Sequence, residues 1–204
     1  MLIFFLFNFF FLSKILVESL IINEYLCEAF APQALPQDLY LRGNIRRWIS
    51  YIGDSIIPLF YGLFRKFQDP VEFELALNKV QENLSVLIEN STLRDGTNYL
   101  FGNELLLADY AFLPFLHNND IVMRKLFSRD LFQSNDDRID KNMKLLKKYY
   151  EFCKTNTEFL TINKNLKDLP NLEKLPMLRN LGMNSLENFD YEIFCAESYK
   201  KFIS

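Results

Sequence analysis

An acidic residue and a hydroxyl stand together at the start of a predicted amphipathic helix, in the stretch Val17–Phe30 (VESLIINEYLCEAF). A helix N-terminus has unpaired backbone N–H groups and a partial positive charge, so it can hold a carboxylate, and the hydroxyl of Ser19 adds a donor. The carboxylate of Glu18 can take an ammonium group. This pair suits the two ends of an α-amino acid, whereas the simpler interpretation is that Ser19 only caps the helix.

The residues best suited to nucleophilic or metal chemistry are few. The chain has three widely spaced cysteines (Cys27, Cys153 and Cys195) and a single histidine, His117. This spacing argues against a disulfide framework and against a zinc site. We therefore predict no metal, no catalytic residue among these groups, and a reducing, cytoplasmic location.

Length and composition indicate a globular chain. It has 204 residues, half of them hydrophobic, and a net charge of −3. That length suits one domain, or a domain with a fragment of another. The charge is too small to suggest a nucleic-acid partner, and short basic runs such as Lys144 with Lys147–Lys148 are typical of a solvated helix face.

The first 13 residues form a separate apolar segment that begins MLIFFLFNFFFL. It is shorter than the roughly 20 residues of a membrane span, and it lacks the basic start and cleavage site of a signal peptide. A membrane partner is therefore not expected. Three interpretations stay open: a weak membrane-targeting segment, a buried strand, or a wrongly chosen start of the gene.

Apolar periodicity and caps predict mainly helical structure after a short strand at Lys14–Val17. We expect a long helix over residues 39–65, kinked near Pro58, because proline removes an intrahelical hydrogen bond. Further helices are predicted from Pro70 to the loop at 90–102, over 106–127, over 136–155 and over 191–203. Residues 157–186 suit short helices joined by turns.

Four motifs occur in a recognisable order: ESLIINEYLCEA at 18–29, APQALPQDLY at 31–40, IPLFY at 57–61, and YLFGN at 99–103, which leads to ADY at 108–110. This order resembles the cytosolic glutathione transferases, and the omega-like and fungal members most closely. The resemblance runs from about Lys14 to about Val122. It implies a mainly α fold, in which a glutathione-transferase C-terminal-like helical bundle follows the last strand and helix of a thioredoxin-like α/β domain.

The resemblance divides the chain into the apolar segment 1–13, a thioredoxin-like remnant at 14–31 and an all-helical domain at 37–204. It implies that Glu18 and Ser19 bind the γ-glutamyl end of glutathione. In omega-type members the nucleophile is a cysteine at the start of the first helix of the thioredoxin-like domain, and none of the three cysteines matches it. The family also has a serine or threonine helix cap where this chain has Leu106, so we expect lower stability or a shifted helix start.

A substrate pocket is expected between the glutathione position and the long helices, with Tyr51, Phe115 and His117 as its candidate residues and Tyr191 as a further one. Each of these side chains also suits ordinary helix packing or exposed surface. The basic cluster Arg42, Arg46 and Arg47 suits a solvated face, a partner subunit or an anionic ligand. The resemblance implies a possible homodimer.

Three functional hypotheses follow. The first is an omega-like glutathione transferase that uses glutathione as substrate or ligand and is truncated, weakly active or inactive in the form given. The second is a non-catalytic helical module for protein interaction. The third is a chain that folds poorly, because the helical surface normally covered by the thioredoxin-like domain is exposed.

Overall fold

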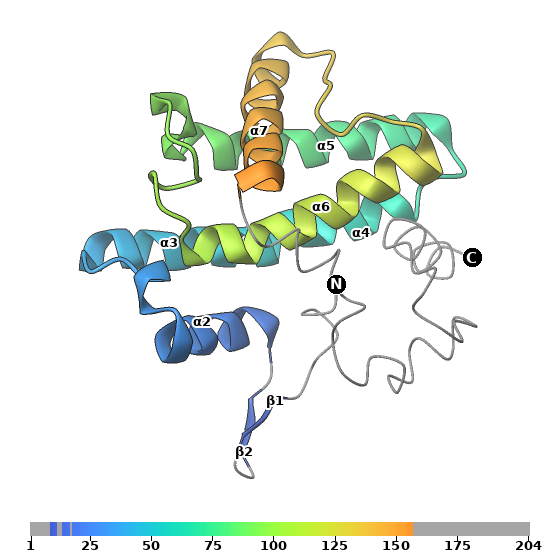
Figure 1. The fold of residues 1–204 in the computed structure, drawn as a ribbon. Helices are drawn as coiled ribbons and strands as arrows, with labels where there is room; N and C mark the ends of the chain where they lie inside the picture. Colours follow the sequence, from blue (N-terminus) through green and yellow to red (C-terminus); the bar gives the residue numbers. More distant parts are fainter. Residues whose placement is uncertain (1–8, 12–13, 17, 157–204) are drawn as a thin grey trace.

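The computed structural model describes residues 9–11, 14–16 and 18–156 and is mainly helical (Figure 1). The predicted elements at 157–186 and 191–203, together with Tyr191 and Cys195, lie outside the described residues. In the bundle of described helices, α6 (Leu107–Phe127) runs beside α3 (Leu39–Tyr51) and α4 (Ile57–Phe64), and α5 (Pro70–Glu89) lies along α4. Helix α7 (Asp137–Asn156) crosses α5 (Figure 1).

A small hairpin precedes the first described helix. Strand β1 (Phe9–Phe11) pairs antiparallel with β2 (Lys14–Leu16), so that Phe9 lies opposite Leu16. The strand predicted at Lys14–Val17 is confirmed to within one residue, and part of the apolar segment also forms a strand. Helix α2 (Ser19–Phe30) follows, and the 3₁₀ turn η1 (Pro32–Ala34) leads from it into the bundle.

The long helix predicted over 39–65 is interrupted in the turn before Pro58, near the position where a kink was predicted. Helix α3 (Leu39–Tyr51) begins after Asp38, whose side chain accepts from the Leu41 N–H at 2.6 Å. A π-helical segment, η2 (Ile52–Ile56), then joins it to α4 (Ile57–Phe64).

Pro58 is the physical reason for this interruption. It has no N–H to donate four residues back, and its ring crowds the carbonyl there. The backbone therefore widens in the turn before it, where the Ile57 N–H donates to the Ile52 carbonyl, five residues back.

The other helices begin and end close to their predicted bounds. Asp69 caps α5 by accepting from the N–H groups of Val71 and Glu72 at 2.9 and 3.2 Å. The turn η3 (Thr92–Asp95) ends at Gly96, whose φ of 85° is the left-handed conformation that glycine adopts without strain. The predicted buried stripe of α5 is confirmed: Phe73, Leu77, Val80, Leu84 and Leu87.

The core is centred on α6, whose side chains are buried almost continuously from Leu107 to Met123. Aromatic rings join it to α4: Phe115 meets Phe60 edge-on at 5.1 Å, and Phe127 stacks on Phe64 at 5.6 Å. Helix α6 also contacts α2, α3 and α7, so it links the N-terminal helices of the described part to its last helix.

Helix α6 begins at Leu107 although Leu106, at its cap position, has no side-chain acceptor. The start is not shifted, because Asp109 takes over the capping from inside the helix. One of its carboxylate oxygens accepts from the Leu106 N–H at 3.0 Å. The other accepts from the Leu100 N–H at 3.1 Å and from the Tyr149 hydroxyl at 2.9 Å.

Candidate functional site

The first turn of α2 carries the predicted glutathione-binding pair. Glu18 is the residue before the helix, with an exposed side chain and a backbone at φ 73° and ψ 113°. Its carbonyl accepts from the Ile22 N–H at 2.9 Å, which closes the first turn. Ser19 is the first helical residue and is half-buried. The interpretation of Ser19 as the helix cap is therefore wrong, because Glu18 holds that position and no side chain caps the helix.

This geometry leaves donors available. The N–H groups of the first turn, from Ser19 to Ile21, precede the first intrahelical bond and have no acceptor within the helix. A non-glycine residue at positive φ is strained by about 1–3 kcal/mol and persists only where its surroundings hold it. The start of α2 thus combines backbone donors that have no acceptor among the described residues, a hydroxyl and a carboxylate on one strained turn, which suits an amino-acid ligand.

Packing against η2 and α3 fixes the position of this turn. A Cβ added at Gly53 would lie 3.2 Å from Leu20 Cδ1, so α2 approaches the π-helical segment closely where the chain has no side chain. On its other side, Arg46 of α3 forms an ion pair with Glu24. These contacts join the start of α2 to the break in the long helix.

The basic cluster on α3 divides among separate partners. Arg46 pairs with α2, whereas Arg42 donates from Nε to the Pro36 carbonyl at 3.0 Å. Arg47 lies over the Trp48 ring at 4.5 Å and donates to the Asn44 side chain. Each of the three guanidinium groups therefore contacts its own neighbour, and the described contacts do not bring them together at one ligand site.

The structure does not bring the three candidate pocket residues together. Tyr51 of α3 donates from its hydroxyl to Asn83 Oδ1 on α5 at 2.9 Å. Phe115 is buried against Phe60 of α4, and His117 Nδ1 lies 2.6 Å from the Tyr150 hydroxyl on α7. Each side chain thus contacts a different helix, and a substrate role for any of them stays a prediction.

Neither described cysteine has the environment of a reactive thiol. Burial, with a smaller contribution from the nearby Glu24 carboxylate, raises the pKa of Cys27. Burial, followed by the charge of Asp109, raises the pKa of Cys153 to about 12. Because the thiolate is the nucleophile, both groups are unreactive at neutral pH.

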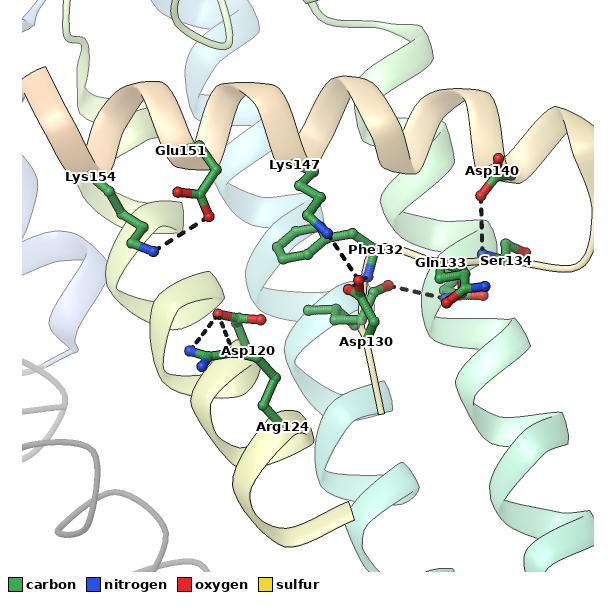
Figure 2. Close-up of polar contacts among 12 residues, drawn as sticks. Asp120, Arg124, Asp130, Phe132, Gln133, Ser134, Asp140, Lys147, Glu151 and Lys154 are labelled. Carbon is green, nitrogen blue, oxygen red and sulfur yellow. Dashed lines mark hydrogen bonds and ion pairs between the residues drawn. The ribbon is translucent and has the colours of Figure 1, made fainter. Parts of the chain in front are cut away.

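A hollow that sequence reasoning missed lies between α6, α7 and the segment that joins them. The cavity has a volume of about 460 Å³ and is lined mainly by charged side chains: Asp120, Arg124, Ser128, Arg129, Asp130, Phe132, Lys147, Glu151 and Lys154. Figure 2 shows side chains of both helices turned towards it. The basic run at 144–148 was its one sequence signal, and only Lys147 of that run lines the cavity.

The described part of the chain has neither a metal-ligand cluster nor a membrane-spanning helix. No three histidine, cysteine, aspartate or glutamate side chains there are grouped as metal ligands. Among the helices of residues 18–156, none has the length and apolar character needed to cross a membrane.

Comparison with known proteins places the chain near the glutathione S-transferases. No protein-family model matches it. A probable glutathione S-transferase of Nicotiana tabacum is 35% identical over 100 residues, which are 48% of this chain and 42% of that protein. Glutathione S-transferase U9 of Arabidopsis thaliana is 35% identical over 85 residues, 41% of this chain and 34% of that protein. The matches thus span less than half the length of these relatives.

Solved structures extend the likeness over nearly the whole chain. The tau-class glutathione S-transferase of mango, Mangifera indica, matches with a TM-score of 0.60 and 22% identity, covering 94% of this chain and 73% of that structure. Glutathione transferase Omega 3C of Trametes versicolor matches with a TM-score of 0.61 and 17% identity, covering 95% and 68%. The predicted fold class, a mainly helical glutathione-transferase-like bundle, is confirmed, and the chain is glutathione S-transferase-like in sequence and fold.

Proposed function

We propose that this chain binds glutathione at the start of α2, through Glu18 and Ser19. The observation that carries the proposal is the uncapped, strained first turn, where backbone N–H groups and the Ser19 hydroxyl lie beside an exposed carboxylate. The relatives named glutathione S-transferases support the choice of ligand.

In the proposed complex, each group has a defined role. The first-turn N–H groups and the Ser19 hydroxyl donate to the α-carboxylate of the γ-glutamyl residue, with the positive end of the helix adding attraction. The Glu18 carboxylate accepts from the ammonium group of the same residue. The missing side chain of Gly53 lets Leu20 of this turn lie close to η2.

We further propose an omega-type protein that does not transfer thiols through its described cysteines. The order of the sequence motifs and the likeness to the Trametes structure support the omega type, while the mango structure supports the tau class as the alternative. Burial keeps the thiols of Cys27 and Cys153 protonated at neutral pH, so neither can attack a substrate. We therefore expect binding of glutathione with little or no turnover.

Calorimetric titration of the 204-residue chain with glutathione tests the proposal. We expect saturable binding that weakens about tenfold or more in Ser19→Ala and in Glu18→Gln, since each loses a charge-assisted hydrogen bond. Ser50→Ala, an exposed serine on α3, is the matched control and should bind as the original chain does. Absence of binding, or equal binding by all variants, would refute the assignment, and clear turnover in a thiol-exchange assay would refute the lack of catalysis.

The alternative is a non-catalytic interaction module, and one surface favours it. Three large apolar side chains are exposed around the α2–α3 corner: Phe30 at 70%, Leu39 at 78% and Tyr40 at 84%. Such a group marks a contact surface for a partner, including a second copy of the chain in a homodimer. Light scattering coupled to gel filtration should show an assembly that Leu39→Ser with Tyr40→Ser reduces to a monomer. A monomer before and after the substitution would count against a homodimer.

A further inference from the structure

The hairpin of β1 and β2 has no role in the glutathione site proposed above. Strand β1 belongs to the apolar N-terminal segment, for which the sequence leaves three interpretations open. In Figure 1 the hairpin projects from the helical bundle, beyond the start of α2. Its two strands pair with each other, and the outer edge of each has no partner strand among residues 9–11, 14–16 and 18–156.

An unpaired strand edge is a binding surface for another strand. It presents a row of backbone N–H and C=O groups that a second chain can pair with. A two-stranded hairpin is also marginally stable in water, and both strands here have only three residues. Pairing with a further strand therefore stabilises the hairpin as well as satisfying its edge.

The two outer edges differ in residue type. Strand β2 begins with Lys14, and a lysine on an edge strand is a common protection against pairing with another chain. Strand β1 consists of three phenylalanines, and residues 1–12 contain no charged residue, proline or glycine. Uncharged segments of high β-propensity without proline are typical of strands that associate. The outer edge of β1 is therefore the edge open to pairing.

A second copy of β1 is the partner that suits this edge. An uncharged strand has no charge pattern for a different strand to complement, whereas aromatic residues pair favourably with one another across strands. Two copies of one strand related by a two-fold axis in the plane of pairing run antiparallel, as β1 and β2 already do. Because the same surface is used by both copies, the assembly closes as a dimer.

We propose that the chain self-associates through β1, so that the hairpins of two copies form one four-stranded antiparallel sheet with β1 next to β1 at its centre. Phe10 is the middle residue of β1, so full overlap of the two strands places Phe10 opposite the same residue of the second copy. This contact is separate from the exposed apolar corner between α2 and α3, and it does not depend on glutathione binding.

The first test is sedimentation velocity of the full chain over a range of concentrations. We expect a concentration-dependent dimer whose dissociation constant rises about tenfold or more in Phe10→Lys, because like charges would then stand opposite each other. Ile15→Lys is the matched control. Ile15 is the residue that pairs with Phe10 inside the hairpin, so both substitutions place a lysine in the same pair, but Ile15 lies on the strand away from the contact. It should leave the dimer unchanged.

Cross-linking is a second test that does not require the contact to be broken. In a chain that also has Cys195→Ser, Phe10→Cys should form a disulfide-linked dimer with diamide as the oxidant, because facing Cα atoms lie about 4.5–5.5 Å apart. Ile15→Cys should not, because three strand spacings, about 14 Å, separate its two copies. The other two cysteines, Cys27 and Cys153, are buried.

Four results would overturn the proposal. They are a monomer at all concentrations, equal effects of the lysine substitutions at Phe10 and Ile15, equal cross-linking of the two cysteine variants, and a dimer that Leu39→Ser with Tyr40→Ser dissociates but Phe10→Lys does not. The last would assign the contact to the α2–α3 corner. A monomer that sediments with phosphatidylcholine vesicles would instead assign the apolar segment to a lipid surface.

Discussion

The starts of α2 and α6 show two ways to build a helix N-terminus without the usual cap. At α6, the Asp109 carboxylate is fully buried and accepts three hydrogen bonds from other parts of the fold. At α2, no side chain caps the helix, and Glu18 is exposed in a strained conformation. At α6 the polar groups bond to one another and stabilise the bundle, whereas at α2 they remain available to a ligand.

Leu106 shows why a missing cap need not be a defect. Losing a serine or threonine cap costs about 0.5–2 kcal/mol. Burying a leucine side chain contributes a similar or larger amount, about 1.5–3 kcal/mol, and Leu106 is buried in the core. The expected shift of the helix start does not occur, and the expected loss of stability stays a prediction.

Removing the α6 carboxylate should have the largest effect. In Asp109→Ala, the N–H groups of Leu100 and Leu106 and the Tyr149 hydroxyl lose their acceptor inside the protein. We expect a loss of about 3–5 kcal/mol in the free energy of unfolding, measured by urea denaturation. Asp54→Ala, at an exposed aspartate in η2, is the control. A small effect at Asp109 would mean that water or relaxation satisfies these donors.

The next largest expected effect is a dependence of stability on pH, which should come from Asp109 at the start of α6. Burial raises the pKa of Asp109 from 3.8 to about 6, and its hydrogen bonds from Leu106, Leu100 and Tyr149 oppose that rise. Because the folded state holds this proton more tightly, the contribution of the group is complete below about pH 4 and is lost as the pH rises through about 6.

Compared with Asp109→Asn, which cannot titrate, the original chain should therefore lose roughly 2–3 kcal/mol of stability between pH 4 and pH 7. The measurement is urea denaturation of both proteins across that pH range. Parallel curves would show that Asp109 titrates near its ordinary value.

Relieving the backbone strain at Glu18, before α2, should increase stability, whereas the changes at Asp109 decrease it. Glycine adopts a φ near 73° without a steric penalty, so Glu18→Gly should stabilise the chain by about 1 kcal/mol. The same substitution removes the carboxylate proposed to bind the ammonium group, and glutathione binding should weaken. Thermal unfolding and calorimetry on one sample would show both changes. A destabilised variant would mean that the Glu18 side chain contributes to the fold.

The smallest expected effect is that of Ser19→Ala on stability. Since Ser19 is the first helical residue and not the cap, its hydroxyl does little for the helix, and we expect a change below about 0.5 kcal/mol. Asp38→Ala, which removes the cap of α3, should cost about 1 kcal/mol in the same denaturation experiment. Equal losses in the two variants would restore the capping interpretation of Ser19.

Local signals explain why most helices could be predicted. The cap and proline at 69–70, the periodic apolar stripe of α5 and the glycine at position 96 act within a few residues of themselves, so they determine where these elements begin and end. The break near Pro58 could be predicted because a proline disturbs the turn before it, but the sequence does not state that the backbone absorbs the disturbance as the π-helical segment Ile52–Ile56.

The sites were less accessible to sequence reasoning. Glu18 and Ser19 are adjacent in the chain, so their pairing could be inferred, but the positive φ and the absence of a cap could not. The lining of the charged cavity comes from residues 120–132 and 147–154, which meet only when α7 folds back on α6. From the sequence alone, the basic run on α7 could be interpreted only as a solvated helix face, because the residues packed beside it are not evident.

The sequence by itself determined the helical class, the helix bounds of the α5–α7 region and the adjacent pair at the start of α2, because periodicity, caps and chain neighbours are local properties. The tertiary structure alone decided that Asp109 accepts hydrogen bonds from a loop and from α7, and that the three candidate pocket residues face different helices. It also decided that opposite charges on α6 and α7 enclose a cavity. Each of these depends on contacts between distant segments, which packing of the whole core selects.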